Sequence, residues 1–404
     1  MKILIIHQNF PAQYRRLVPA LLAKGHTLRA LSQRKEKTLL GVRNYYYPIH
    51  QNALSNQHDW LRSSESALLR AQAIATVCEY WKKTGYSPDV ILVHTGWGES
   101  LFLKDVWSNA RVIGYFEYFY HTQGAEVNFD PEFPAKPDIA YRLRMRNQHL
   151  LSSLQSCDMG VTPTQWQYSR FPTEWQKKLQ VIHEGIDTNN ARPLSTAWIK
   201  LSNNRVLSTG DEVITFVNRN LEPLRGYHRF MRALPAILKA RPLAQVIIIG
   251  GDRHSYGRKP TAYQSYKQQF LQEVKGQLDM QRVHFVGHVD YTTFLKILQI
   301  SSVHVYLTYP FILSWSLLEA MSAQCAIVAS RTAPVQEVIK HTQTGLLVDF
   351  FDQDSLIEQI SQLLAQRSQQ HYCTIRENAR QFVKQFYDFQ TVCLPKQLAI
   401  IGSH

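Results

Sequence analysis

Hydrophobic and polar positions along the chain alternate between short apolar runs and longer segments with helical spacing. Short apolar runs bounded by polar or glycine-containing turns are typical of buried parallel strands. In the first half of the chain such runs lie at residues 2–6, 27–31, 90–93, 112–115 and 159–162. Between them, apolar residues recur at helical intervals in residues 11–24, 65–83 and 141–153. The pattern predicts an α/β domain in which strands and helices alternate.

A second alternating series follows a segment with little periodicity. Residues 188–211 are rich in Asn, Ser, Pro and Gly, and we interpret them as a linker. Beyond it, strands are predicted at residues 213–217, 245–249, 283–286, 303–307 and 326–329, and helices at residues 227–239, 353–366 and 374–386. Two such series predict two Rossmann-like, doubly wound domains. Because such sheets bind ligands at the carboxyl ends of their strands, we expect the domains to face each other across a cleft.

The domain boundaries follow from the same pattern. We expect a first Rossmann-like domain over residues 1–187 and a second over residues 212–387. Residues 388–404 are expected to form a C-terminal helix that packs back on the first domain.

The charge of the chain points to an anionic partner. Among 404 residues, 45 Lys and Arg stand against 31 Asp and Glu, for a formal net charge of +14. Such a surplus suits a nucleotide phosphate, a phospholipid head group, a lipid-linked diphosphate or a nucleic acid. The basic residues are scattered, and no recognition helix, zinc finger or RNA-recognition motif is present, so nucleic acid is not an expected partner.

Cysteine usage and hydropathy indicate a cytoplasmic protein. The five cysteines, at positions 78, 157, 325, 373 and 393, are odd in number and contain no CxxC pair. This pattern argues against a disulfide framework and against a zinc site. The N-terminal apolar run is too short for a signal peptide, and no stretch approaches the ~20 apolar residues of a membrane span. Any contact with an anionic membrane is therefore expected to be peripheral, at the inner face of the cell membrane.

The segment of residues 309–330 carries the strongest chemical signal. It runs from a strand end through a turn into a helix, and Ser316 and Glu319 form an S-x-x-E capping box that predicts the start of this helix. The amides of residues 314–316 would then suit a phosphate, because a helix N-terminus offers free N–H groups and partial positive charge. On this pattern alone, Glu319 either only caps the helix or accepts hydrogen bonds from ribose hydroxyls.

Two arginines in residues 216–230 form a second candidate site. Arg219 follows a predicted strand, and Arg225 with Gly226 opens a helix. Cations beside a departing diphosphate stabilise its developing charge in place of a metal ion, and arginine does so with two parallel hydrogen bonds. The alternative is a pair of surface arginines, although a helix N-terminus disfavours cations.

These segments resemble the family 4 glycosyltransferases of the GT-B fold. The family signature is a Glu, then Phe-Gly, then Leu-Glu-Ala-Met, and the last part matches the sequence around Glu319. Leu313-Ser314 stands in place of Phe-Gly, and Phe311 stands in place of the first Glu, which in the family usually touches the donor sugar. The surrounding sequence is similar to that of a bacterial branch of the family that carries Phe at this position.

The resemblance implies that the second domain binds a nucleotide-diphosphate sugar. Asn218 and Arg225 replace the Gly and the Lys of the family's diphosphate-gripping element, and residues 285–289 resemble the segment along the base. The implied donor-binding residues are Asn218, Arg219, Arg225, Gly250, Gly251, Asp252, His288, Val289, Phe311, Leu313, Ser314, Trp315, Ser316 and Glu319. Of these, Arg219, Arg225 and Glu319 are candidates for catalysis.

The resemblance also implies that the first domain binds the acceptor. The implied acceptor-binding residues are Gln8, Asn9, Phe10, Gln13, Trp97, Gly98 and Glu99, which follow two predicted strands. Glu117 and His121 are both candidates for the residue near the reacting carbon, and the sequence does not choose between them.

The implied function is that of a retaining, metal-independent hexosyltransferase of class EC 2.4. The donor phosphate itself would take the proton of a glycan or lipid-linked acceptor, so no metal or other cofactor is expected, and polysaccharide or glycoconjugate biosynthesis is the expected setting. Two alternatives remain: a catalytically inactive sugar- or nucleotide-binding GT-B protein, which the Phe311 departure would suit, and a GT-B-like phosphorylase or epimerase. The absence of G-x-G-x-x-G and P-loop motifs argues against a dinucleotide oxidoreductase and a P-loop enzyme.

Overall fold

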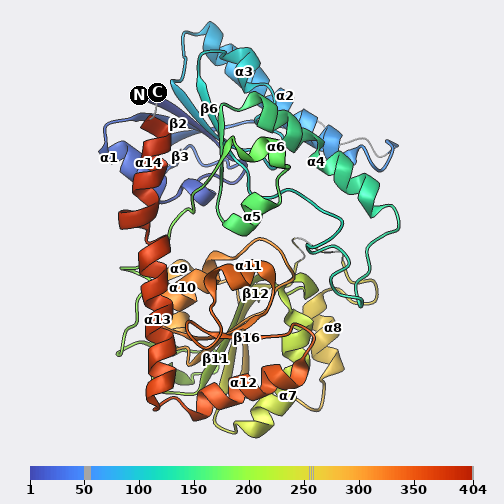
Figure 1. The fold of residues 1–404 in the computed structure, drawn as a ribbon, viewed down its shortest axis with the longest axis vertical. Helices are drawn as coiled ribbons and strands as arrows, with labels where there is room; N and C mark the ends of the chain where they lie inside the picture. The colour runs from blue at the N-terminus through green and yellow to red at the C-terminus, as the bar shows by residue number, and fades with distance from the viewer. Residues whose placement is uncertain (50–55, 254, 256, 258, 403–404) are drawn as a thin grey trace. The chain divides into compact units, whose positions relative to one another are not determined.

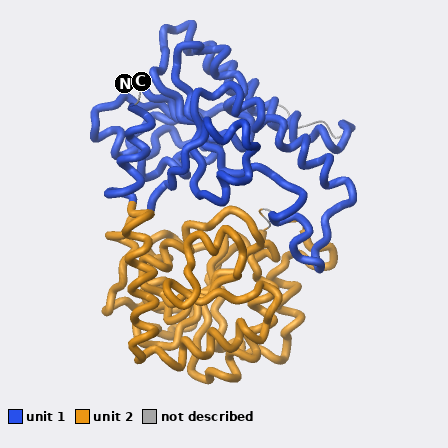
Figure 2. Tube along the Cα trace, in the orientation of Figure 1, with its two compact units in different colours: residues 1–185, 389–404 blue, residues 186–388 orange. Residues whose placement is uncertain are grey.

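The chain consists of two compact units, coloured separately in Figure 2. The computed structural model describes residues 1–49, 56–253, 255, 257 and 259–402. The first unit comprises residues 1–185 and 389–404, and the second comprises residues 186–388. Each is built on a mostly parallel sheet, which confirms the predicted α/β class.

The first unit contains an eight-stranded sheet in the order β3-β4-β2-β1-β5-β6-β7-β8. Neighbouring strands are parallel except β3 and β4. The strands are β1 (Lys2–Ile6), β2 (Thr27–Ser32), β3 (Thr38–Leu39), β4 (Val42–Tyr46), β5 (Val90–His94), β6 (Arg111–Tyr115), β7 (Met159–Thr162) and β8 (Leu179–Val181). The sequence pattern did not predict β3, β4 or β8, because β3 and β8 are very short and β4 contains the polar residues Arg43 and Asn44.

Helices cover both faces of this sheet (Figure 1). They are η1 (Ala12–Tyr14), α1 (Leu17–Ala23), α2 (Arg62–Lys83), α3 (Leu103–Val106), α4 (Ile139–Ser156), α5 (Gln165–Ser169), α6 (Thr173–Gln176), η3 (Phe389–Cys393) and α14 (Leu394–Gly402). Leu4 and Ile6 of β1 face a core cluster shared with α2, α3 and α4. Ile3 and Ile5 face the opposite cluster, shared with α1 and α14. The period-two alternation of β1 thus distributes its side chains between two helical layers.

The second unit contains a six-stranded parallel sheet in the order β13-β12-β11-β14-β15-β16. The strands are β11 (Val213–Asn220), β12 (Gln245–Gly251), β13 (Val283–Gly287), β14 (Val303–Tyr306), β15 (Ala326–Ser330) and β16 (Leu346–Val348). The helical elements are η2 (Pro223–Arg225), α7 (Tyr227–Ala240), α8 (Tyr266–Glu273), α9 (Tyr291–Gln299), α10 (Trp315–Ser322), α11 (Ala333–Val338), α12 (Gln353–Ala365) and α13 (Gln370–Tyr387). Strand order reverses between β11 and β14, and ligands of doubly wound sheets bind outside the carboxyl ends of strands at such a point.

The segment predicted as a linker, residues 188–211, differs from the expectation. It contains β9 (Trp198–Lys200) and β10 (Val206–Ser208), which form an antiparallel pair. Ile199 and Leu207 of this pair pack with Ile297 and Ile300 in a core cluster of the second unit. The strands are too short for a periodic signal, and contacts with α9 stabilise them.

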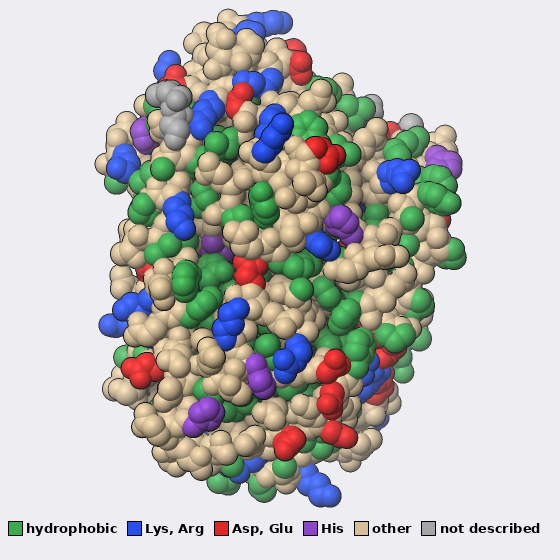
Figure 3. Space-filling model, viewed as in Figure 1, with side chains coloured by type: hydrophobic (Ala, Val, Ile, Leu, Met, Phe, Trp, Pro, Cys, Tyr) green, Lys and Arg blue, Asp and Glu red, His purple; other side chains and the backbone are tan. Residues whose placement is uncertain are grey.

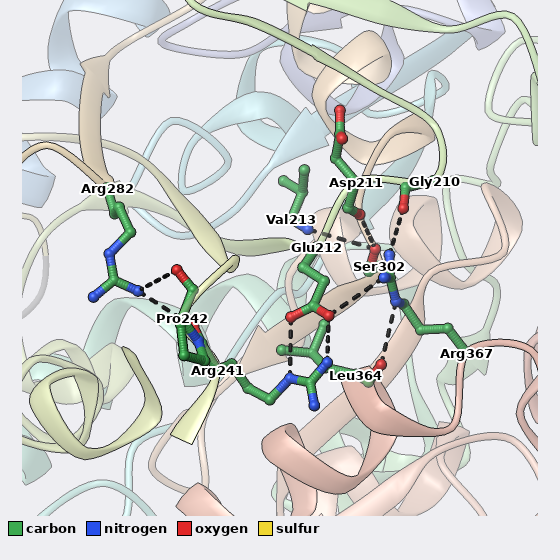
Figure 4. Close-up of polar contacts among 10 residues, drawn as sticks. All are labelled: Gly210, Asp211, Glu212, Val213, Arg241, Pro242, Arg282, Ser302, Leu364 and Arg367. Carbon is green, nitrogen blue, oxygen red and sulfur yellow. Dashed lines mark hydrogen bonds and ion pairs between the residues drawn. The ribbon is translucent and has the colours of Figure 1, made fainter. Parts of the chain in front are cut away.

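The amino end of β11 is held by a buried carboxylate between two arginines (Figure 4). Glu212 accepts hydrogen bonds from both Nε and Nη2 of Arg241, with the Nε at 3.0 Å. Nη2 of Arg367 lies 3.3 Å from Oε1 of the same carboxylate. Arg241 directly follows α7, and Arg367 lies just beyond the end of α12. Glu212 therefore connects these two helices to the amino end of β11.

Within the part of the chain that the structure describes, no helix combines the length and the apolar character needed to cross a membrane. On the face shown in Figure 3, Lys and Arg side chains are scattered, with acidic and apolar side chains between them.

Candidate active site

A left-handed glycine in the second unit places Arg225 beside the end of β14. Gly226 separates η2 from α7 and has φ +69°, a conformation that side-chain-bearing residues rarely adopt. A Cβ on this glycine would lie 2.2 Å from Cβ of Leu307, the residue that follows β14. Only glycine therefore lets the chain turn this close to β14, which brings the preceding residue, Arg225, to the carboxyl ends of β11 and β14.

The side chain of Arg225 is buried at this turn. Its Nη1 donates to the Tyr306 hydroxyl at 3.3 Å, the Thr308 hydroxyl at 3.0 Å and the Ile312 carbonyl at 2.8 Å. The ring centroid of Phe311 lies 5.4 Å from the guanidinium carbon, within the range of a cation–π contact. The structure thus brings together two predicted donor residues, Arg225 and Phe311, at positions where the sequence departs from the family pattern.

Helix α10 begins earlier than the capping box predicted. Its N-cap is Ser314, whose hydroxyl accepts a hydrogen bond from the amide of Ser316 at 3.3 Å, so the predicted Ser316–Glu319 box is wrong. Ser314 has the extended backbone of an N-cap residue, with φ −83° and ψ 142°, whereas Ser316 already lies inside the helix. The amide of Ser314 donates to the Tyr306 hydroxyl at 2.9 Å. The amides of Ser314 and Ser316, predicted to face a phosphate, are therefore bonded within the protein.

Glu319 lies inside α10 with its side chain buried. Its Oε1 accepts a hydrogen bond from the hydroxyl of Tyr291, the first residue of α9, at 2.9 Å. Trp315 packs partly buried against the core cluster that also contains Leu313. Glu319 therefore joins α10 to α9 instead of capping its own helix.

The end of β12 approaches His288 closely. A Cβ on Gly251 would lie 2.3 Å from Nε2 of His288, so the imidazole lies directly against this glycine. Gly250, just before it, has φ +157°. Asp252 is exposed and pairs with Nζ of Lys267 at 3.4 Å. Of this group, the structure brings together Gly251 and His288, while Asp252 takes part in a surface ion pair.

Three further predicted donor residues lie at the edges of this region. Asn218 donates to the backbone carbonyl of Arg225 at 3.4 Å and so supports the turn. Arg219 is exposed near the end of β11. Val289 packs partly buried against the cluster formed around β9 and β10.

In the first unit, a chain of hydrogen bonds orients Glu117. Nδ1 of His7 accepts from the amide of Asn9 at 2.9 Å, so Nε2 carries the proton and donates to Oε1 of Gln13 at 2.7 Å. The Gln13 amide nitrogen in turn donates to Oε1 of Glu117 at 3.3 Å. The pKa of His7 lies well below its ordinary value, chiefly because the imidazole is buried. This histidine is therefore neutral.

His94 approaches the same carboxylate from the next strand. Its Nδ1 accepts from the amide of Gly96 at 3.1 Å, which leaves the proton on Nε2, 3.7 Å from Oε2 of Glu117. Trp97 stacks on the His94 ring with centroids 4.3 Å apart. The Glu117 side chain is 31% exposed, whereas the His94 side chain is only 2% exposed. A partly accessible carboxylate therefore lies beside a buried imidazole.

Three predicted acceptor residues have structural roles instead. Phe10 is fully buried in the core against β1. Gly98 has φ +101°, and a Cβ there would meet the Ala67 carbonyl of α2 at 2.5 Å. Glu99 is buried and accepts from the Tyr47 hydroxyl at 2.9 Å, and burial raises the pKa of this carboxyl. An aromatic or acidic residue that follows a strand can be buried in the core or exposed at the surface. Only the tertiary packing decides between these two positions.

Gln8 and His121 make other contacts. The Gln8 side-chain oxygen accepts from Nε of Arg70 at 3.1 Å. Nε2 of His121 lies 2.5 Å from the backbone carbonyl of Arg170, and its ring lies 5.7 Å from that of Phe119. The structure thus places Glu117, and not His121, in the cluster with Gln13 and the buried imidazoles.

The sequence pointed to the segments that begin at His7 and His94, but it did not identify these two histidines or Tyr306 as site residues. His7 directly follows β1 and His94 ends β5, and these two strands pair in the sheet. Their rings lie 4.9 Å apart. Two histidines at the carboxyl ends of two predicted parallel strands were an available signal, since such ends can share one edge of a sheet.

Comparisons with known proteins cover most of the chain. Residues 24–191 match the family described as "Glycosyl transferase family 4 group", and residues 200–382 match "Glycosyl transferases group 1". An uncharacterized glycosyltransferase of Methanocaldococcus jannaschii, MJ1607, is 26% identical over 221 residues, which is 54% of this chain and 52% of that protein. The putative glycosyltransferase YtcC of Bacillus subtilis is 25% identical over 233 residues, 54% of this chain and 53% of YtcC. The chain thus spans about half the length of the curated relatives it matches.

Solved structures share the fold. Sucrose-phosphate synthase of Thermosynechococcus elongatus superposes with a TM-score of 0.74 at 17% identity, covering 99% of this chain and 98% of that one. HepE of Anabaena, in complex with UDP and glucose, superposes with a TM-score of 0.69 at 16% identity and covers 99% of both chains. Identities this low show the fold alone. The two family matches, which together cover most of the chain, show that it belongs to the family 4 glycosyltransferases, and the solved structures show the GT-B fold.

Proposed function

We propose that this chain is a retaining, metal-independent glycosyltransferase that takes a sugar from a nucleoside diphosphate donor. The observation that carries the proposal is the buried Arg225, held at the carboxyl ends of β11 and β14 where the strand order reverses. An arginine fixed at this position supplies positive charge where doubly wound sheets bind phosphates. HepE, a protein of the same fold, was crystallised with UDP and glucose, so UDP-glucose is the first donor to test.

In the proposed reaction, an acceptor hydroxyl attacks the anomeric carbon on the face that the diphosphate leaves. The new C–O bond forms as the bond to the diphosphate breaks, and the acceptor proton passes to a phosphate oxygen of the leaving group. Arg225 stabilises the charge that develops on the diphosphate, and Arg219 adds a second cation. No metal is needed in this scheme, because the two guanidinium groups carry the positive charge.

Glu117 supplies the acceptor side of the proposal. Its carboxylate is partly exposed and is oriented by Gln13 and His94, so it is suited to accept hydrogen bonds from sugar hydroxyls. The acceptor is proposed to be a glycan or a lipid-linked sugar, in polysaccharide or glycoconjugate assembly, with peripheral contact to the inner face of the membrane. The net charge of +14 supports an anionic acceptor or surface.

The test is a thermal-shift and hydrolysis screen with UDP-, GDP- and ADP-linked sugars, with EDTA present throughout. Stabilisation by one nucleotide, with slow release of that nucleotide from its sugar conjugate, is the expected result. Arg225→Ala should lower turnover by about 10²-fold, a typical effect of losing a contact to developing charge. Lys239→Ala, which removes an exposed cation from the end of α7, is the matched control and should leave turnover unchanged.

Two results would contradict the proposal. Failure of every nucleotide to bind would refute the donor site. Binding without release, even with sugar acceptors added, would favour the alternative of an inactive nucleotide-binding protein, for which Phe311 in place of a carboxylate is the specific observation.

A further inference from the structure

A polar pocket opens at the amino ends of β11 and β14, at the other end of these strands from the candidate donor site. Four segments of the second unit line it: the turn after β10, the end of α9 with the residues before β14, the turn between α12 and α13, and the first turns of α13. Its wall includes Gly210, Ser302, Arg367, Ser368, Tyr372 and Arg376. The pocket encloses about 670 Å³, part of which is open to solvent, and this volume is in the range of small-molecule sites.

Arg367 is fixed in this wall by three hydrogen bonds. Its Nε donates to the Leu364 carbonyl at 3.2 Å, its Nη1 to the Gly210 carbonyl at 2.5 Å, and its Nη2 to Oε1 of Glu212 at 3.3 Å (Figure 4). A guanidinium is planar and carries five N–H donors. Three bonds therefore fix the plane of this group and leave two N–H donors for a ligand.

Arg376 lines the same pocket from α13. Its Nε donates to the backbone carbonyl of Gln324, and its guanidinium carbon lies 4.9 Å from the ring centroid of Tyr372. Tyr372 is fixed in turn, because its hydroxyl donates to the Ser302 carbonyl at 2.6 Å. Among the residues that the structure describes, neither terminal nitrogen of Arg376 has a hydrogen-bond partner. The guanidinium is thus held at Nε, while its outer N–H groups remain unbonded.

The charge around the pocket favours an anion. Glu212, the carboxylate bonded to Arg367, also binds Arg241, so one negative charge lies between two guanidinium groups. The carboxylate of Asp211 accepts hydrogen bonds from the amide and the hydroxyl of Ser208 at 2.7 and 3.0 Å. The described residues that line the pocket include two arginines and no carboxylate. An anion that enters the pocket therefore meets positive charge without a carboxylate in the wall to repel it.

We propose that this pocket binds a phosphate monoester, with Arg376 and Arg367 as the ligands of its phosphate group. Arginine binds phosphate oxygens with parallel, charge-assisted hydrogen bonds, which suits a dianion. The volume leaves space for a sugar-sized group attached to the phosphate, and the hydroxyl of Ser368 offers a further polar contact. Because the pocket lies at the amino ends of the strands, this site is separate from the donor site and does not depend on the proposed function.

The experiment measures binding of glucose 6-phosphate and of inorganic phosphate to the full chain by isothermal titration calorimetry, with glucose as the uncharged comparison. Arg376→Gln removes the guanidinium that has unbonded terminal nitrogens. Lys384→Gln is the matched control, since it removes an exposed cation from the last turn of the same helix. Arg225→Gln is included to separate this pocket from the donor site.

Glucose 6-phosphate should bind more tightly than inorganic phosphate, and glucose should not bind. Arg376→Gln should weaken binding of the monoester by about tenfold, the effect of losing a hydrogen bond between charged groups. Lys384→Gln and Arg225→Gln should leave its affinity unchanged. Ser368→Glu places a carboxylate in the wall and should also weaken binding, through repulsion between like charges. This second variant keeps the test decisive if Arg376→Gln folds poorly.

Several outcomes would overturn the proposal. Failure of the monoester to bind would do so, as would an affinity that is unchanged in both Arg376→Gln and Ser368→Glu. Equal weakening by Lys384→Gln would reveal a general effect of charge in place of a site. Loss of binding in Arg225→Gln alone would assign the phosphate to the donor site, and tighter binding of inorganic phosphate would exclude the monoester as the preferred ligand. None of these results bears on the proposed function, which the screen of nucleotide sugars tests separately.

Discussion

Replacing Gly226 by alanine should destabilise the second unit through two separable effects. Gly226 has φ +69°, and a Cβ there would lie 2.2 Å from Cβ of Leu307. Gly276, in the same unit, has a similar φ of +82°, but a Cβ there would meet nothing within 4 Å. Gly276→Ala is therefore the matched control: it carries the backbone cost without the steric overlap.

The magnitudes follow from these two geometries. A left-handed conformation costs an alanine about 1 kcal/mol, so Gly276→Ala should lower the free energy of unfolding by about that amount. Overpacking a well-filled site adds roughly 1–3 kcal/mol, so Gly226→Ala should cost about 2–4 kcal/mol in total. For a unit of this size, each 1 kcal/mol lowers the melting temperature by about 2–4 °C.

Hydrogen exchange of peptides from β11, β14 and α7, measured by mass spectrometry on the full chain, would report the loss within the second unit. Because Leu307 directly follows Tyr306, whose hydroxyl accepts from Arg225, relief of the overlap should also displace Arg225 and weaken nucleoside diphosphate binding in Gly226→Ala alone. Equal destabilisation by the two alanines would refute the reasoning, since it would mean that Leu307 moves aside at no cost.

Three further outcomes follow from other contacts. Glu117→Gln should lower kcat by about 10²-fold and His121→Asn by much less, because only Glu117 joins the histidine cluster; steady-state kinetics showing the reverse order would refute that choice. Burial lowers the pKa of His149 to about 4 and of His304 to about 3, so below the unfolded value of about 6.5 the unfolded chain binds protons that the native chain does not. Stability should therefore fall between about pH 6.5 and 4, by about 2 kcal/mol per histidine at pH 5, and His304→Gln should flatten the dependence of the urea midpoint on pH; an unchanged slope would contradict this. Glu212→Gln leaves Arg241 and Arg367 without their shared carboxylate and should lower the free energy of unfolding, measured with urea, by roughly 1–3 kcal/mol. A decrease below about 0.5 kcal/mol would contradict this expectation.

Much of the fold could be predicted because its signals are local. The apolar run of residues 2–6 is β1 to the residue, and the helix predicted at residues 227–239 is α7 with one more residue. The prediction failed where local signals compete. Ser314 and Ser316 are both good capping residues, and only the backbone conformation shows that Ser314 is the cap. The short hairpin of β9 and β10 carries too few residues to show a period.

The sequence identified several residues of the candidate site but not the contacts that they make. The family pattern identified Arg225 and Phe311 but could not show that they contact each other. It assigned Phe10 and Glu99 to the acceptor, whereas both are buried in the first unit. It left Glu117 and His121 open, and the structure separates them through their partners.

The sequence by itself determined the α/β class, the family and the presence of a cationic turn, because periodicity and short motifs are properties of neighbouring residues. Only the tertiary structure decided what contacts the cation, since the three groups that accept from Nη1 of Arg225 lie 81 to 87 positions further along the chain. The same holds for Gln13 and Glu117, which are 104 positions apart. Contacts at such separations depend on how strands are ordered in a sheet, and strand order is set by the burial of many side chains together, which no local pattern encodes.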